Sequence, residues 1–525
     1  MEGVVLNKLT GTPVKNAHVW YIKVATGASE SGQPVSTDSD AAGRFAIQLG
    51  AGSYRLWVER SGYARQAFGS RTPEGSGSVL ALDPGQQMRD LEFKLTPFGV
   101  IAGAVYDEDG DPLQGVGIQV LRFSYATGQQ QLIPAFGAGT NDRGEFRAYD
   151  LPAGRYLLLA TPRSEVLSRP TETTGLVPQQ RQLFAPVYYP GALDSASASE
   201  ISLGEGAEIT GIDFRLPKVR AFTLRGRLLS PVEDLTGSEL HVALAHSDGN
   251  LASNINRVSA TIDKVSGRFE LQSVAPGSYW LVASQLHRRV ALSGRIPVEV
   301  SATAPPESLT VPLTPAFEVE GRVEVEQGTT SLAKVTVRLS SADGLAPGPG
   351  PASRVAADGS VRLAGVTPGV WDLSIDAIPE GLWIKSETYG DSDVLQGRLN
   401  ISASPPSVLH IVLAANGAQV TGTVTGAANA GQATVVLAPA APELRRSAAM
   451  YRTASTQDHG VFVFKGVRPG TYKLFAFEDV EPFAWLDAEV MKPVESLGET
   501  ISVVEGDRVA RQLVTIPAEA LLPGR

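Results

Sequence analysis

Three glycine motifs recur in the same order along the chain, and this repetition constrains the fold more than any other feature of the sequence. The first glycine lies within a short β-prone run, the second lies in a turn before a strand, and the third precedes an aromatic residue. The copies are Gly3, Gly103, Gly226, Gly321 and Gly422 for the first motif, Gly43, Gly144, Gly267, Gly359 and Gly460 for the second, and Gly52, Gly154, Gly277, Gly369 and Gly470 for the third.

The three motifs keep register with one another. Successive copies are separated by 100, 123, 95 and 101 residues for the first motif, 101, 123, 92 and 101 for the second, and 102, 123, 92 and 101 for the third. The chain of 525 residues therefore contains five repeated units, which suits a multidomain protein. We expect these domains at 1–96, 97–217, 218–314, 315–414 and 415–525, the last with a short tail.

Each unit has the pattern of a β-sandwich. Tyr54, Leu56 and Val58 alternate onto one face of a strand that follows a Gly-bearing turn, and later units repeat the pattern with Pro beside the Gly. About seven such strands per unit predict an all-β fold, a tandem array of five antiparallel seven-stranded β-sandwich domains. Prolines in the joints 95–97, 216–218 and 313–315 limit bending, so we expect a semi-rigid, end-to-end string.

The order G-x-V, then D-x(1–3)-G-x-F, then P-G-x-Y-x-L resembles the carboxypeptidase regulatory-like domain. Unit 2 matches this pattern best, and unit 4 departs most, with Val361 in place of the Phe and Trp371 in place of the Tyr. The resemblance implies a transthyretin-like (prealbumin-like) sandwich, which is also similar to carbohydrate-binding folds. It implies a spacer, accessory or binding module of extracytoplasmic bacterial proteins, without the catalytic domain.

Composition and motifs exclude several classes of function. A net charge of −10 without a basic block disfavours nucleic-acid binding, and no apolar run approaches the length of about 18 residues that a membrane span needs. The chain has 0 Cys, and none of its 6 His begins a zinc-peptidase motif. A serine-hydrolase elbow and a P-loop are also absent from the sequence. We therefore predict a protein that is not an enzyme.

The beginning of unit 1 bears on localisation. Only Met1 and Glu2 precede its first glycine, whereas later units have several β-prone residues there. We expect that a leader ahead of Met1 has been lost, and that the protein is extracytoplasmic, in the periplasm, at the cell surface or secreted.

Unit 2 contains a long loop, expected at 161–199, whose second half carries three aromatic residues, Phe184, Tyr188 and Tyr189. Long loops on rigid sandwiches are frequent binding sites. Two interpretations stay open: the rings anchor the loop on the sandwich, or they form a platform for a sugar or a partner chain.

Two tryptophans of unit 1 form a second candidate site. Trp57 alternates away from the face of Tyr54, and Trp20 is expected beside it on a neighbouring strand. Exposed rings here would stack on sugars, whereas covered rings would have a packing role.

The acidic turn Asp107, Asp109 and Asp111 is a calcium candidate, because alternating carboxylates supply oxygen ligands. The same residues around Gly110 also suit an ordinary hairpin turn. No other cofactor is expected.

Unit 5 is predicted to contain one short helix near 482–492. Phe483, Leu486, Val490 and Met491 share one helical face, and Trp485 lies off it. We expect this helix to cover a sandwich edge.

These features predict a non-enzymatic, extracytoplasmic structural or binding protein, with a glycan or another cell-surface protein as partner. The alternative is a carbohydrate-binding accessory protein that acts with separate hydrolases or with an outer-membrane uptake system.

Overall fold

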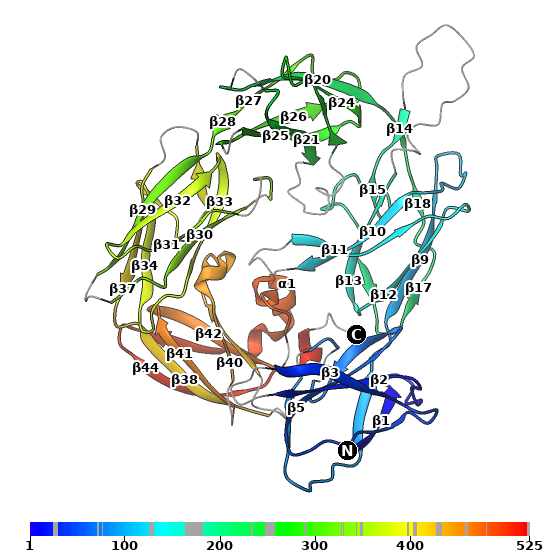
Figure 1. Ribbon diagram of the computed structural model, residues 1–525, viewed down its shortest axis with the longest axis vertical. Coiled ribbons are helices and arrows are strands. Elements are labelled where there is room, and N and C mark those ends of the chain that lie inside the picture. The colour runs from blue at the N-terminus through cyan, green and yellow to red at the C-terminus, as the bar shows by residue number, and fades with distance from the viewer. Residues whose placement is uncertain are drawn as a thin grey trace.

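The fold was analysed in a computed structural model of the chain. The model describes residues 1–24, 30–70, 73–75, 77–124, 131–162, 182–232, 235–246, 258–287, 290–326, 328, 330–342, 344–346, 350–395, 398–402, 407–426, 433–456, 460–478 and 480–521. Within these residues the chain is all-β, as the sequence predicts, and it forms many separate sheets (Figure 1). We refer to the five repeated stretches as units 1 to 5.

Units 1 and 2 each place two main sheets face to face. In unit 1 the sheets have the orders β4-β1-β8 and β3-β2-β5-β6, and β7 also pairs with β5. Its strands are β1 (Glu2–Asn7), β2 (His18–Val24), β3 (Glu30–Asp38), β4 (Arg44–Ala46), β5 (Gly52–Arg60), β6 (Tyr63–Ala67), β7 (Val79–Leu82) and β8 (Leu91–Leu95).

In unit 2 the orders are β11-β10-β13-β15, with β16 on β13, and β12-β9-β17, with β18 on β9; β14 and β19 form a small third sheet. Its strands are β9 (Gly99–Tyr106), β10 (Gly117–Ser124), β11 (Gln131–Gly139), β12 (Glu145–Leu151), β13 (Gly154–Thr161), β14 (Gln182–Phe184), β15 (Val187–Tyr188), β16 (Ile201–Leu203), β17 (Glu208–Ile209), β18 (Phe214–Arg215) and the following β19 (Lys218–Arg220).

Units 3 and 4 repeat this arrangement. The orders are β23-β24-β20-β27 and β22-β21-β25-β26-β28 in unit 3, and β32-β29-β37-β34-β35 and β31-β30-β33-β36 in unit 4. The strands are β20 (Phe222–Leu229), β21 (Glu239–His246), β22 (Val258–Ser259), β23 (Thr261–Ile262), β24 (Arg268–Val274), β25 (Gly277–His287), β26 (Val290–Val300), β27 (Leu309–Pro312), β28 (Thr314–Pro315), β29 (Phe317–Val325), β30 (Thr336–Ser341), β31 (Ala352–Arg354), β32 (Ser360–Val366), β33 (Gly369–Asp376), β34 (Trp383–Tyr389), β35 (Ser392–Asp393), β36 (Leu399–Ile401) and β37 (Leu409–Ala414).

Unit 5 combines the sheets β41-β38-β44 and β40-β39-β42-β43 with short helices. Its strands are β38 (Ala418–Thr425), β39 (Thr434–Pro439), β40 (Arg452–Ser455), β41 (Val461–Val467), β42 (Gly470–Phe477), β43 (Glu499–Val503) and β44 (Arg508–Val514). The helical segments are the 3₁₀ helices Leu444–Arg446, Ala448–Met450, Ala484–Leu486, Lys492–Leu497 and Ala518–Leu521, and α1 (Ala488–Met491).

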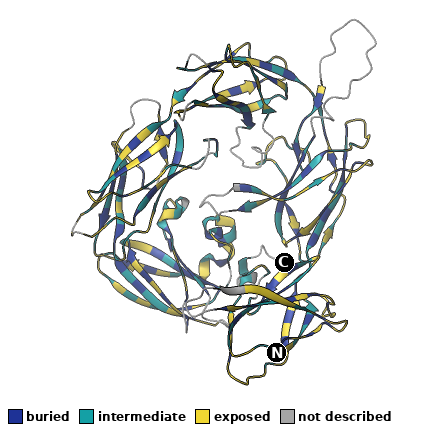
Figure 2. Cartoon of the chain, in the orientation of Figure 1, coloured by how far each residue is buried: buried dark blue, intermediate teal, exposed yellow. Residues whose placement is uncertain are grey.

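Each unit has its own hydrophobic core. The five core clusters are drawn from residues 5–95, 101–216, 222–313, 319–413 and 418–513, and none of them mixes side chains of two units. Figure 2 shows buried positions alternating with exposed ones along strands of every unit. Each unit therefore gains the apolar burial that stabilises it from its own stretch of chain.

One feature of the sheets differs from the predicted antiparallel pattern. The first strand of each unit pairs in parallel with a strand near the end of the same unit, as in β1 with β8, β20 with β27, β29 with β37 and β38 with β44. In unit 2 the same position is shared by β17 and β18, which both pair in parallel with β9. The parallel pair brings the two ends of each unit together.

The first glycine motif is explained by close packing at this parallel pair. Each of these glycines lies opposite the residue after the second glycine motif, which is Phe in four units and Val361 in unit 4. A Cβ on Gly226 would lie 2.4 Å from the Leu309 carbonyl oxygen and 2.4 Å from Cζ of Phe269. The ring and the neighbouring backbone thus occupy the space that a side chain would need.

The aromatic residue of the third motif closes a turn in every unit. Tyr54, Tyr156, Tyr279 and Tyr472 donate their hydroxyl hydrogens to the carbonyl oxygen four residues earlier, at 3.1, 2.7, 3.1 and 2.8 Å. In unit 4 the indole N–H of Trp371 makes the equivalent bond to Thr367, at 2.9 Å. Trp371 therefore preserves both the burial and the hydrogen bond that the Tyr supplies elsewhere.

The helical segment of unit 5 lies where the sequence predicts it, but it is not one continuous helix. Phe483 has a left-handed φ of 66° and Asp487 is extended, so the chain forms Ala484–Leu486 and α1 as separate turns. The prediction that Trp485 lies off the apolar face is wrong, because Trp485 is only 7% exposed and packs with Phe475 and Phe477 of β42.

The units do not form the expected end-to-end string. Figure 1 shows them following a curve that returns on itself, with α1 on the inner side of the curve. Ion pairs join unit 5 to unit 2: Glu481 contacts Arg122 at 3.3 Å, and Asp487 contacts Arg155 at 3.8 Å. We call this arrangement the curved array.

We predict that Gly226→Ala destabilises unit 3 by about 1–3 kcal/mol, because the new methyl group must displace the Phe269 ring or the β27 backbone. Hydrogen exchange with mass spectrometry would report faster exchange in peptides of unit 3. The matched control is Gly137→Ala in β11, where a Cβ would meet no atom within 4 Å. Equal hydrogen-exchange protection of unit 3 in the Gly226→Ala and Gly137→Ala variants would contradict the close-packing explanation.

Candidate functional site

The described second half of the unit 2 loop, residues 182–199, is folded onto the sandwich, and residues 163–181 of the predicted loop lie outside the described residues. Tyr188 is 4% exposed and packs in a second cluster with Leu121, Leu157 and Leu159. Its strand β15 pairs with β13, where Tyr188 lies opposite Leu159. Tyr188 therefore fills a core and does not offer a ring face to a ligand, which agrees with the anchoring interpretation.

The other two aromatic residues of the loop are half-buried. Tyr189 packs edge-on against Phe214 of the unit 2 core, with 5.8 Å between the ring centroids. Phe184 packs against the same core, and the Lys218 ammonium lies 5.9 Å from the centre of its ring. Both rings thus connect the loop to the sandwich and to the segment that leads into unit 3.

The two tryptophans of unit 1 are neighbours across strands, as the sequence predicts. Trp20 lies opposite Trp57 between β2 and β5, and the rings stack with centroids 6.3 Å apart at 13°. The Arg65 guanidinium on β6 lies 4.7 Å from the Trp57 ring centre. Because β2 and β6 flank β5 on opposite sides, Trp57 has the Trp20 ring on one side and the Arg65 guanidinium on the other. A sugar could stack on Trp57 only by displacing one of these two side chains.

The acidic turn of unit 2 holds an ion pair with the segment that leads into unit 3. The Asp107 carboxylate accepts hydrogen bonds from the backbone N–H of Asp109 and of Asp111, each at 2.9 Å. The Lys218 ammonium contacts Asp107 at 3.3 Å and Asp109 at 2.9 Å. These bonds and Lys218 lower the pKa of Asp107 against the opposing effect of its burial.

Lys218 is already the cation in this turn. A calcium ion would have to displace its ammonium and recruit further oxygens. In the part of the chain that the structure describes, no group of three or more His, Cys, Asp or Glu side chains could hold a metal ion. Calcium binding at Asp107, Asp109 and Asp111 stays a prediction.

The segment that leaves each unit is hydrogen-bonded to one variable connection of that unit. This connection follows the strand of the third glycine motif, and it contains β6 in unit 1, β14 and β15 in unit 2, the far part of the β25–β26 hairpin in unit 3, β34 and β35 in unit 4, and α1 in unit 5. We call it the variable connection.

The bonds are of the same kind in all five units. In unit 1 the Phe98 N–H donates to Gly62 O at 3.0 Å, and in unit 3 the Ala316 N–H donates to Ala291 O at 2.9 Å. In unit 2 strand β14 pairs with β19. The Gly417 N–H donates to Gly381 O at 3.1 Å in unit 4, and the Glu478 N–H donates to Ile516 O at 2.9 Å in unit 5. The exit direction of the chain is therefore fixed by the unit that it leaves.

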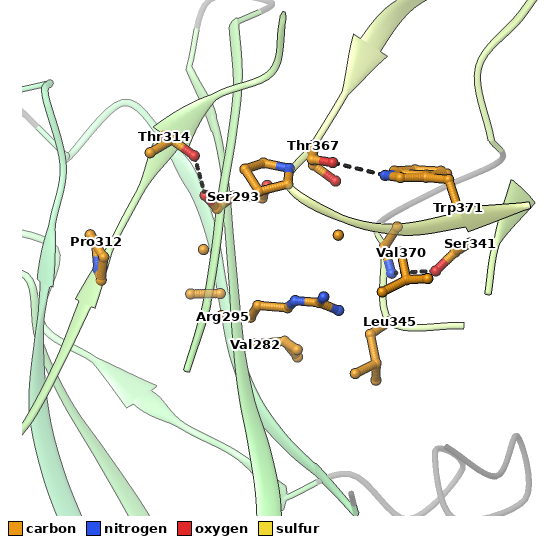
Figure 3. A pocket seen from close by; sticks show the side chains of 15 residues that line it. Val282, Ser293, Arg295, Pro312, Thr314, Ser341, Leu345, Thr367, Val370 and Trp371 are labelled. Carbon is orange, nitrogen blue, oxygen red and sulfur yellow. Dashed lines mark hydrogen bonds between the residues drawn. The ribbon is translucent and has the colours of Figure 1, made fainter. Parts of the chain in front are cut away.

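A pocket of about 190 Å³ lies at the junction of units 3 and 4 (Figure 3). The Arg295 guanidinium on β26 enters it beside Trp280, 5.0 Å from the ring centre, and a Cβ on Gly369 would lie 3.6 Å from it. Apolar side chains such as Val282, Leu345 and Val370 form the walls. As far as the described lining goes, it includes no carboxylate and no histidine, so it carries no acid–base pair for catalysis.

The junction of units 4 and 5 contains a buried acid. Glu387 on β34 is 4% exposed. Burial, and secondly the charge of Asp393, raise its pKa to about 8, against the opposing effect of Arg468 from unit 5. Glu387 is therefore largely protonated at neutral pH.

Comparison with known proteins identifies the class of the first unit. Residues 1–96 match the family model of the carboxypeptidase regulatory-like domain, which confirms the resemblance that the glycine and aromatic motifs indicate. No curated protein matches the chain.

Three similar solved structures are bacterial proteins of low identity. The Bacillus anthracis TIE protein is 11% identical over 76% of this chain and 68% of its own, with a TM-score of 0.16. GBS52, a minor pilin of Streptococcus agalactiae, is 12% identical over 42% and 96%, with a TM-score of 0.22. BcpA, the major pilin subunit of Bacillus cereus, is 10% identical over 61% and 99%, with a TM-score of 0.16. Scores this low carry no argument about function.

We predict that Tyr188→Ala lowers the stability of unit 2 by about 3–5 kcal/mol, since it leaves a cavity where a large ring is buried. Calorimetry would show an earlier transition, and proteolysis would begin in unit 2. Tyr149→Ala, which removes a ring that is 50% exposed in the same unit, is the control and leaves the transition almost unchanged. An unaltered transition in Tyr188→Ala would show that the ring does not anchor the loop.

We predict that unit 4 becomes less stable as the pH rises from about 5 to about 9. The folded-state pKa of Glu387 is raised, so its contribution is fully present below the unfolded-state pKa and is lost as the pH passes through about 8. Glu387→Gln, which keeps the neutral shape, flattens this dependence in calorimetric scans. Glu380→Gln, at a side chain 78% exposed in the same junction, keeps the wild-type profile. An unchanged pH dependence of stability in Glu387→Gln would refute the assignment of this dependence to Glu387.

Proposed function

We propose that the chain is a non-enzymatic, extracytoplasmic structural or binding protein that holds five sandwich units in a fixed curve. The observation that carries the proposal is the recurring hydrogen bond between each variable connection and the segment that leaves its unit. A tether without such bonds would leave neighbouring units free to reorient, which is the default for domains in one chain. Fixed joints suit a protein that presents surfaces at set distances.

One comparison supports this proposal. The match of unit 1 to the carboxypeptidase regulatory-like domain favours an accessory or spacer role. No helix among the described residues is long and apolar enough to cross a membrane. We propose a cell-surface protein as the partner of this chain.

Carbohydrate binding remains the alternative, and the geometry favours it less. Tyr188 is buried, and Trp57 is enclosed by Trp20 and Arg65. A sugar could stack on Trp57 only by displacing one of these neighbours, because stacking needs a free ring face.

The proposal is tested on intact cells and in solution. We expect protease added to intact or outer-membrane-permeabilised cells to digest the protein while a cytoplasmic marker survives. We also expect small-angle scattering of the purified chain to fit one curved shape rather than a broad ensemble. Protection of the protein together with the cytoplasmic marker would contradict the localisation, and an ensemble of extended shapes would contradict the fixed curve.

A further inference from the structure

The variable connection of unit 5 differs from the other four in what it contacts. In units 1 to 4 this connection holds the segment that leads into the next unit. In unit 5 it also reaches across the curve to unit 2, a part of the chain more than 300 residues earlier: Arg122 and Glu481 are 359 residues apart in sequence. This ion pair and the pair of Arg155 with Asp487 both join two units that are not consecutive.

Three buried apolar side chains attach this segment to unit 5. Trp485, Met491 and Val494 are 7%, 3% and 0% exposed, and they pack on Phe475 and Phe477 of the unit 5 sheet. The segment is therefore held in place by its own unit. Its position does not depend on unit 2, so the contact with unit 2 can open without unfolding the segment.

The side that faces unit 2 is acidic, and the surface that it meets is basic. The Glu481 carboxylate lies 3.3 Å from the Arg122 guanidinium, and both side chains are 44% exposed. The Asp487 carboxylate lies 3.8 Å from Arg155, and these side chains are 10% and 28% exposed. Arg155 also contacts Glu200 of its own unit at 3.4 Å, so unit 2 holds this arginine in position.

The two arginines come from adjacent strands. Arg122 lies on β10 opposite Tyr156, the residue that follows Arg155 on β13. By the alternation of side chains along a strand, Arg122 and Arg155 leave the sheet from opposite faces, and each guanidinium meets one carboxylate of the segment. We define Arg122 and Arg155 as the receptor pair, and residues 480–498 as the latch.

We propose that the latch closes the curved array by docking its carboxylates on the receptor pair, and that the array opens when these ion pairs are broken. The interaction is electrostatic and partly exposed, so salt must weaken it. Opening also requires the backbone hydrogen bonds of at least one joint between units 2 and 5 to break, and the chain then becomes longer with its five cores intact. The latch therefore sets the distance between the two ends of the array, which the proposed spacer role does not itself require.

The test measures one distance across the latch. The chain has 0 Cys, so two introduced cysteines take spin labels without background. Leu193→Cys in unit 2 and Leu497→Cys in unit 5 are suitable, since these side chains are 67% and 57% exposed. Double electron–electron resonance on the full chain then gives the distance distribution in about 50 mM and about 1 M NaCl, where the screening length falls to about 3 Å.

We expect one short, narrow distance at low salt, and a loss of most of this population at high salt. Glu481→Arg combined with Asp487→Asn opens the array already at low salt; Asn is chosen because Asp487 caps α1 by accepting from the Glu489 N–H, and Asn preserves this cap. The exchange of Arg122→Glu with Glu481→Arg restores the short-distance population. This population is severalfold larger than in either single reversal.

The control is Glu489→Arg, which reverses the charge of a carboxylate in the same latch at a side chain that is 67% exposed and pairs with Lys492 inside the latch. It keeps the short distance. A short distance that survives both the reversal and high salt would overturn the electrostatic latch, and a long distance in the wild-type chain at low salt would overturn the closure itself. Unchanged far-ultraviolet circular dichroism in all variants excludes unfolding as the cause of opening.

Discussion

The arrangement of this protein depends on backbone hydrogen bonds between the segment that leaves each unit and the variable connection of the same unit. These bonds are ordinary in strength, and a single one contributes about 1 kcal/mol. Their effect is geometric, because they fix the first residues of the joint as an extension of a sheet that is already folded. A joint built in this way has one direction for as long as its hydrogen bonds hold. Four such joints in series give a curve, whereas four free tethers would give an ensemble.

The position of the variable connection explains how units with one fold perform different structural tasks. The glycine and aromatic motifs fix the two sheets, because Gly226 leaves room for Phe269 and Tyr279 closes its turn on Ala275. The variable connection lies outside this set of contacts, so its length can change without disturbing the core. In unit 2 it covers the outer face of a sheet with Tyr188, and in unit 5 it forms the latch.

The sequence predicts the local features well and the long-range ones poorly. Glycine spacing and alternation predict the sandwiches, and the cross-strand pair of Trp20 and Trp57 follows from two short strands. The parallel pair of first and last strands could not be predicted, because alternation identifies a strand but not its partner. The sequence does not indicate Lys218 in the acidic turn for the same reason: 109 residues separate Lys218 from Asp109. The curvature of the array results from several joints in series, and each joint is set by contacts between residues that are far apart in the sequence.

Trp485 shows why the sequence does not predict the latch. A periodic stripe assumes one helix, but the left-handed Phe483 and the extended Asp487 rotate the segment twice, which turns Trp485 inward. The same breaks leave Glu481 and Asp487 on the side toward unit 2. A continuous helix with Trp485 exposed would have required a partner for an apolar face. The broken segment instead satisfies its apolar residues within unit 5, and only charge remains for the contact across the curve. Partly exposed ion pairs can break and re-form, whereas apolar burial of this extent does not open so easily. The contact across the curve is therefore the one that can open.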